Sequence, residues 1–199
     1  FLNSQKIFYL PTTIPTDFFK PKNKRLIRKK LGFNQKDKII IFVGRIGYLK
    51  GIDLFLNSVI NNPDKRFILI GNLVDRTIEI KNFKNLILLP PKSQKELVDY
   101  YNTADLCFFP SRLEGVALVP REAMSCGTPT ILLDTLSSKS IKEAIKVPID
   151  NEEINATVKS FFDLSKNKRK ELSKKSRKYI QTEYDNNVWK DLYSKILLN

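Results

Sequence analysis

The chain contains 199 residues, of which 42% are hydrophobic and 28% are charged, and it carries a net charge of +14. This composition is typical of one globular domain, and no apolar run approaches the length of a membrane-spanning helix. Because the chain has no histidine, Ser–His and Cys–His nucleophilic systems and most zinc sites are excluded.

Charge and cysteine usage indicate the surroundings of the chain. A basic face could bind anionic lipid or nucleic acid. The lysines are scattered and are not interleaved with exposed aromatic residues, which favours a solvated, lysine-rich surface instead. Cys107 and Cys126 fall in predicted core or helix positions, so we interpret them as buried thiols of a reducing compartment.

The first predicted elements are a strand and a basic helix. Residues 6–21 form an extended apolar run that is broken by three prolines, which predicts a strand and then an ordered connector. A basic helix over residues 22–31 follows and ends at Gly32. Because the chain starts at Phe1 rather than at methionine, we expect a fragment or a processed chain.

A strand over residues 38–45 leads into a loop that suits a phosphate group. The apolar run ends at Gly44, the loop carries Arg45 and Lys50, and a helix begins at Ile52. Such a strand, loop and helix present backbone N–H groups at the carboxyl edge of a parallel sheet. Arg45 and Lys50 would neutralise a diphosphate there, and the alternative is that they are two solvated loop cations.

Two further strands and a capped helix follow. The strands cover residues 67–70 and 85–89, and the second ends in Pro-Pro-Lys at residues 90–92. Ser93 caps a helix that reaches residue 102, and Glu96 completes a capping box. A strand over residues 105–109 then leads into the central segment of the chain.

The central segment, residues 110–129, must turn, form a short helix and return to the strand at residues 130–133. Pro120 suits the first helical position, and Gly127 suits the left-handed position after the helix. The N–H groups of residues 115–119 would then lie at the carboxyl edge of the sheet, where the helix dipole favours an anion.

Glu114 and Glu122 lie on either side of this turn. Two carboxylates beside an anion site are expected where the ligand also offers hydroxyl groups, since a carboxylate accepts from two donors at once. A nucleotide sugar has phosphates in its middle and hydroxyl-rich rings at both ends. The segment therefore predicts a nucleotide-sugar site.

The C-terminal third has a short edge strand and three helices. The edge strand covers residues 146–149, and the helices cover residues 151–164, 166–182 and 184–198. The second helix is crowded with lysine and arginine. It could lie on an anionic surface, although a solvated face is the favoured interpretation.

The segment from Glu114 to Pro129 resembles the Glu-x7-Glu motif of retaining GT-B glycosyltransferases of family 4. The positions in register are Glu114, Gly115, Leu118, Glu122, Ala123, Met124, Gly127 and Pro129. The sequence departs at Val116, which is usually aromatic, and at Ala117, which is usually glycine. Gly44, Arg45 and Lys50 resemble a second signature of the family, and residues 7–21 resemble its interdomain segment.

The resemblance implies a Rossmann-like, doubly wound α/β fold with about six parallel strands, as in the C-terminal domain of GT-B enzymes. Residues 1–199 would form this single nucleotide-sugar-binding domain. Residues 1–21 would be the interdomain segment, and residues 183–199 a helix that crosses towards an N-terminal acceptor domain. That acceptor domain would be absent from the chain.

The resemblance also assigns the site residues. Arg45 and Lys50 would bind the donor diphosphate and Glu114 the donor sugar, and these three would form the catalytic set. Glu122 would bind the ribose diol, and Lys92 lies where the base is contacted. The remaining donor-binding positions would be Gly44, Gly115, Val116, Ala117 and Leu118. Since cations stabilise the leaving group, no metal or other cofactor would be required.

The implied function is retaining transfer of a hexosyl group from a UDP- or GDP-linked sugar to a glycan or lipid-linked acceptor. This places the chain in polysaccharide biosynthesis, in the cytoplasm or at the cytoplasmic membrane surface. The alternative is a non-catalytic nucleotide-sugar-binding module, or a subunit that needs a separate N-terminal partner. Ala117 and a missing Gly-Gly loop after Leu133 favour that alternative. A nucleic-acid binder would rest on charge alone.

Overall fold

The computed structural model describes residues 11–75 and 77–197. These residues form a six-stranded, all-parallel sheet with the strand order β3-β2-β1-β4-β5-β6. The strands are β1 (Ile39–Val43), β2 (Arg66–Ile70), β3 (Leu86–Leu89), β4 (Leu106–Phe109), β5 (Thr130–Leu133) and β6 (Ile145–Val147). The predicted Rossmann-like α/β fold with about six parallel strands is therefore confirmed.

The central strands are short apolar runs that are buried on both faces, as expected for parallel strands between two layers of helices. Every residue of β1, β4 and β5 is buried. β1 pairs with β2 along its whole length, from Ile39 opposite Arg66 to Val43 opposite Ile70. The central strands therefore end close to one level, and the loops that follow them share one edge of the sheet.

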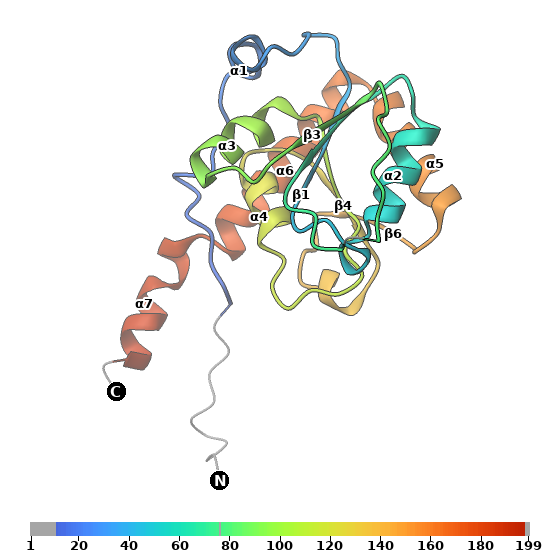
Figure 1. Ribbon diagram of the computed structural model, residues 1–199. Coiled ribbons are helices and arrows are strands. Elements are labelled where there is room, and N and C mark those ends of the chain that lie inside the picture. Colours follow the sequence, from blue (N-terminus) through green and yellow to red (C-terminus); the bar gives the residue numbers. More distant parts are fainter. Residues whose placement is uncertain (1–10, 76, 198–199) are drawn as a thin grey trace.

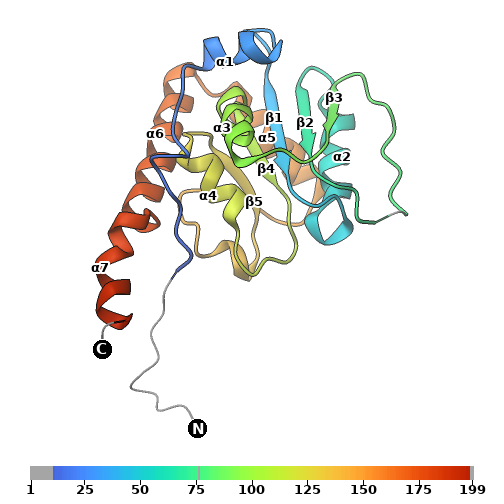
Figure 2. The same ribbon diagram turned by 60° about the vertical axis from the view of Figure 1, so that its left-hand side comes forward.

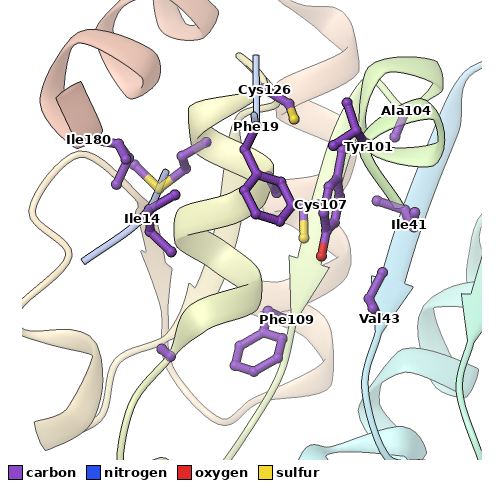
Figure 3. Packing of buried hydrophobic residues seen from close by; sticks show 14 of the residues in the cluster. Ile14, Phe19, Ile41, Val43, Tyr101, Ala104, Cys107, Phe109, Cys126 and Ile180 are labelled. Atoms are coloured by element: carbon purple, nitrogen blue, oxygen red, sulfur yellow. The ribbon is translucent and has the colours of Figure 1, made fainter. Parts of the chain in front are cut away.

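Helices cover both faces of the sheet (Figures 1 and 2). The helices are α1 (Lys24–Leu31), α2 (Ile52–Asn61), α3 (Gln94–Thr103), α4 (Leu118–Ser125), α5 (Asn151–Asp163), α6 (Lys166–Glu183) and α7 (Asn186–Leu197). Alternate residues of β1 enter two core clusters, because successive side chains of a strand point to opposite faces. One cluster, part of which Figure 3 shows, packs under α3, α4 and α6, and the other packs under α2 and α5.

Two helix starts test the turn chemistry expected from the sequence. The predicted capping box is present at α3, where the Ser93 side chain and Glu96 each accept from the other's backbone N–H. α4 begins at Leu118, so Pro120 is its third residue and not its first. Pro120 is still tolerated, since the N–H groups of a first helical turn have no partner within the helix. Gly127 has the expected left-handed conformation, with φ 78°.

The edge of the sheet beyond β5 differs slightly from the expectation. Residues Leu136–Ser138 form a short 3-10 turn where the resembled family has a Gly-Gly loop. β6 then begins one residue earlier than predicted and ends at Val147. In the described ranges, 11–75 and 77–197, no helix is both long and apolar enough to cross a bilayer.

The segment that precedes α1 runs against the junction of α6 and α7. The predicted strand starts at residue 6 and lies outside the described residues as far as residue 10. Beyond that point, the Ile14 N–H donates to the Tyr184 carbonyl across 2.7 Å. The Tyr193 hydroxyl donates to the Pro11 carbonyl across 2.8 Å. α7 itself projects from the body of the fold (Figures 1 and 2).

Replacing Phe55 by alanine should destabilise the fold strongly. Phe55 is fully buried, with its ring centroid 5.3 Å from that of Phe42, 5.5 Å from Phe67 and 6.2 Å from Phe108. Deleting such a ring leaves a cavity that costs about 3–5 kcal/mol. Urea denaturation would measure the free energy of unfolding. Ile60→Ala, at an exposed position of the same helix, should cost no more than about 0.5 kcal/mol. Equal losses of stability in the two variants would contradict the placement of Phe55 in the core.

Candidate functional site

The candidate site lies where the strand order reverses. β1 is followed in the sheet by β2 and β3 on one side, whereas β4 is followed by β5 and β6 on the other. β1 and β4 are neighbours, with Ile40 opposite Leu106. Open parallel sheets bind ligands at the carboxyl ends of the strands where such a reversal occurs. The loops after β1 and β4, which carry most of the predicted site residues, meet at this point.

A glycine allows the two loops to touch. Gly51 precedes α2 with φ 71°, and a Cβ placed there would lie 1.9 Å from the Pro110 carbonyl oxygen. Both the left-handed backbone and the contact exclude a side chain at this position. The short 3-10 turn Tyr48–Lys50 just before Gly51 is thereby pressed against the loop that follows β4.

Arg112 forms hydrogen bonds that link the two loops. Its backbone N–H donates to the Leu49 carbonyl across 2.9 Å, and its guanidinium makes two hydrogen bonds of 2.7 Å to the Asp53 carboxylate. The guanidinium also lies 4.2 Å from the centre of the Tyr48 ring. The hydrogen bonds to Asp53 raise the pKa of Arg112 above its ordinary value. This contact between Arg112 and Asp53 could not be predicted from the sequence, because no local pattern pairs residues 59 positions apart.

Lys50 and Glu114, two of the three predicted catalytic residues, form an ion pair. Their side chains are 18% and 11% exposed, so the pair is largely shielded from water. Arg45, the third, is exposed and forms no ion pair with any described residue. A diphosphate would compete with Glu114 for Lys50, and its binding would leave the Glu114 carboxylate able to accept from ligand hydroxyls.

Glu122 lies on α4, where it is nearly buried at 8% exposed. The Tyr101 hydroxyl, on α3, donates to Oε2 of Glu122 across 2.8 Å. Burial raises the pKa of Glu122, and the hydrogen bond from Tyr101 partly opposes that rise. Tyr101 is a second residue whose contact could not be predicted from the sequence, since its position in α3 indicates only that it belongs to a buried helix face.

The predicted backbone donors lie in the turn between Glu114 and the start of α4. The N–H of Leu118 donates to the Val116 carbonyl across 3.0 Å. The N–H groups of Gly115, Val116 and Ala117 donate to no acceptor among the described residues. Of the four predicted backbone donors, Leu118 is therefore already used within the protein, and the other three are available to an anion.

The remaining predicted positions lie around this centre. Ala117 is buried and lines a small pocket beside Glu114, with an interior of about 10 Å³, roughly one water molecule. Lys92 follows β3 at the outer edge of the sheet and pairs with Glu96 at 3.4 Å. The structure does not bring Lys92 into contact with the other predicted residues. Among the described residues, no three His, Cys, Asp or Glu side chains are grouped so as to hold a metal ion.

Comparisons with known proteins identify the family of the chain. The sequence profile of the family described as glycosyl transferases group 1 matches residues 23–179. D-inositol 3-phosphate glycosyltransferase from Mycobacterium sp. (strain KMS) is 34% identical over 129 residues, which are 59% of this chain and 29% of that protein. The chain therefore matches less than a third of the length of this curated relative.

Solved structures share the fold, and two examples follow. The C-terminal domain of a glycosyl transferase group 1 family protein (LpcC) from Francisella tularensis is 19% identical, with a TM-score of 0.73. That match covers 87% of this chain and 99% of that domain. HepE from Anabaena, in complex with UDP and glucose, is 14% identical, with a TM-score of 0.80, over 94% of this chain and 55% of HepE.

Replacing Gly51 by alanine should separate the two loops. Gly32 offers a matched control, because its φ of 77° is equally left-handed but a Cβ there meets nothing within 4 Å. Gly32→Ala should cost about 1–2 kcal/mol from backbone strain alone. Gly51→Ala should cost clearly more, because the Pro110 carbonyl must also move. Urea denaturation would measure the free energy of unfolding of both variants. Equal losses in Gly51→Ala and Gly32→Ala would mean that the two loops can move apart at no cost.

Proposed function

The chain belongs to the glycosyl transferases group 1 family, and on that basis we propose that it is the C-terminal, donor-binding domain of a retaining glycosyltransferase of family 4. The observation that carries the proposal is the meeting of Lys50 with Glu114 at the reversal point of the sheet, beside the helix that holds Glu122. A cation and two carboxylates at one sheet edge suit a ligand that has both phosphates and hydroxyl groups.

Lys50 and Arg45 would bind the diphosphate of the donor. Lys50 leaves Glu114 for the phosphate oxygens, and the exposed Arg45 adds its planar group of donors from the same loop. The N–H groups of Gly115, Val116 and Ala117 contribute further donors. Together they stabilise the negative charge that develops on the departing nucleoside diphosphate, which is the main catalytic contribution of such a site. A metal ion is then not required.

The two carboxylates would bind the two sugar rings of the donor. Glu114, once free of Lys50, accepts from hydroxyl groups of the transferred hexose, and Glu122 accepts from the ribose diol. The backbone near Gly44 and Lys92 would border the nucleoside. A UDP- or GDP-linked donor fits this arrangement, and the complex of HepE with UDP and glucose supports it.

The acceptor would be bound by a domain other than the donor-binding domain. An acceptor hydroxyl must attack the sugar from the side that is open at the carboxyl edge of the sheet. We assign the binding of this acceptor to an N-terminal acceptor domain. Residues 11–21 and α7 would connect to that domain. The acceptor would be a glycan or a lipid-linked glycan, bound in the cytoplasm, and the lysine-rich α6 would suit contact with an anionic membrane surface. Alone, the chain would bind nucleotide and transfer little sugar.

A non-catalytic binding module is the second candidate. It is favoured by Ala117, whose buried side chain lines a pocket too small for a sugar ring. In that case the chain would bind a nucleotide sugar but would support no transfer even beside an acceptor domain.

Calorimetric titration of the chain with UDP, GDP and ADP tests the proposal. One nucleotide should bind saturably, and Lys50→Gln should weaken it about tenfold or more, because a charge-assisted hydrogen bond contributes about 1.5–3 kcal/mol. Glu122→Ala should also weaken it. Lys36→Gln removes the same charge at an exposed position that precedes β1, whereas Lys50 follows this strand, and it should leave affinity unchanged. A folded chain that binds none of the three nucleotides would contradict the proposal.

Glu114→Gln should have the opposite effect on free UDP. UDP has no hexose for Glu114 to bind, so in this complex Glu114 only competes for Lys50. Removing the carboxylate charge should therefore tighten UDP binding about two- to fivefold, in line with the modest net contribution of an ion pair that keeps some contact with water. The same titration shows whether the UDP affinity rises or falls. Weaker UDP binding would mean that Glu114 does not compete with UDP for Lys50.

A further inference from the structure

A buried hydroxyl and a nearly buried carboxylate meet behind the proposed nucleotide site. Tyr101 on α3 has none of its surface exposed, and Glu122 lies on α4. The Tyr101 hydroxyl donates to Oε2 of Glu122 across 2.8 Å, between residues that are 21 positions apart. None of the roles proposed above uses Tyr101, so its contact with Glu122 needs its own explanation.

Tyr101 is held rigidly. Figure 3 shows its ring between Ile41 and Cys107, with the hydroxyl oxygen pointing towards the end of the sheet at which Phe109 lies. The Tyr101 carbonyl accepts from the Thr128 hydroxyl across 2.7 Å, which fixes the helix end that carries the ring. A hydroxyl donor that is held in this way also restricts the orientation of the carboxylate to which it donates.

No cation balances the charge of Glu122 among the described residues. The ionisable groups that face it are Tyr101 on α3, Cys107 on β4 and Cys126 at the end of α4. Burial raises the pKa of each thiol to about 12 and the pKa of Tyr101 well above its ordinary value. All three are therefore neutral near neutral pH, and the Tyr101 hydrogen bond is the contact that favours the ionised form of Glu122.

The contact uses only one oxygen of the carboxylate. Oε2 of Glu122 accepts from Tyr101, whereas no described residue donates to Oε1. Each carboxylate oxygen can accept about two hydrogen bonds. Oε1 therefore has the capacity for two adjacent donors, which is what a vicinal diol provides.

We propose that Tyr101 is a positioning residue, whose hydroxyl fixes one oxygen of Glu122 and so presents the other oxygen to the ribose 2′ and 3′ hydroxyls. This inference rests on the proposed function, because it takes the ligand of Glu122 to be the ribose of a nucleotide. Since the partner is a neutral hydroxyl and not a lysine or arginine, no cation competes with the ribose for the carboxylate.

Titration of UDP at several pH values, from about 5.5 to 8, tests the proposal on three forms of the chain. Tyr101→Phe keeps the ring but removes the donor, so Glu122 should take up a proton at higher pH than in the unmodified chain. UDP should then bind about tenfold more weakly near pH 6 and recover part of that loss near pH 8. Tyr100→Phe, the same substitution at the neighbouring half-buried position, should change nothing.

Two further measurements identify the group that titrates. Glu122→Gln still accepts from Tyr101 but cannot ionise, so its UDP affinity should follow only the protonation of the diphosphate, which all variants share. Carbon-13 NMR of the Glu122 carboxyl in the ligand-free chain should give a higher pKa in Tyr101→Phe than in the unmodified chain.

The outcomes separate the inference from the function on which it rests. A folded Tyr101→Phe chain that binds UDP as the unmodified chain does at every pH would overturn the role of Tyr101 and leave the donor site intact. An unchanged NMR titration would overturn it too. If the unmodified chain binds no nucleoside diphosphate, the proposed function fails, and the role of Tyr101 fails with it.

Discussion

The candidate site depends on one close approach, that of the Gly51 backbone to the Pro110 carbonyl. Because nothing larger than hydrogen fits between them, the loop after β1 rests directly on the loop after β4. Arg112 then reaches Asp53, and Lys50 reaches Glu114, across strands that are neighbours in the sheet but more than sixty residues apart in the chain. The sheet supplies a rigid base, and the glycine sets the spacing at which the charged groups of both loops meet.

The two glutamates of the central segment have contrasting environments. Glu114 is paired with a cation, whereas Glu122 is paired with a neutral hydroxyl in a nearly dry position. A carboxylate that is paired with a cation can release that cation to an anionic ligand, so the cation keeps a negatively charged partner. A carboxylate that is held by a hydroxyl keeps one oxygen available throughout. The same chemical group is therefore prepared for two different kinds of contact by what surrounds it.

Much of the fold could be predicted from the sequence, because its signals are local. The apolar runs at β1 and β4, the capping box at Ser93 and the left-handed Gly127 each depend on residues within a few positions of one another. The start of α4 was misplaced by two residues, since proline is acceptable anywhere in a first turn. The site was predictable only in part. The contacts of Arg112 with Asp53 and of Tyr101 with Glu122 join separate elements, and no local period encodes such pairs.

The first described residues are attached close to the helix that carries Glu122. The Arg121 guanidinium donates to the Thr12 carbonyl across 3.0 Å and lies 4.1 Å from the centre of the Tyr184 ring. Arg121 is the neighbour of Glu122 in α4, and Tyr184 ends α6 where Ile14 is bonded. Arg121 therefore joins the segment before α1 and the end of α6 to α4, the helix that carries Glu122. A domain attached through residues 11–21 or through α7 would be connected to the residue next to this carboxylate by one hydrogen bond and one ring contact.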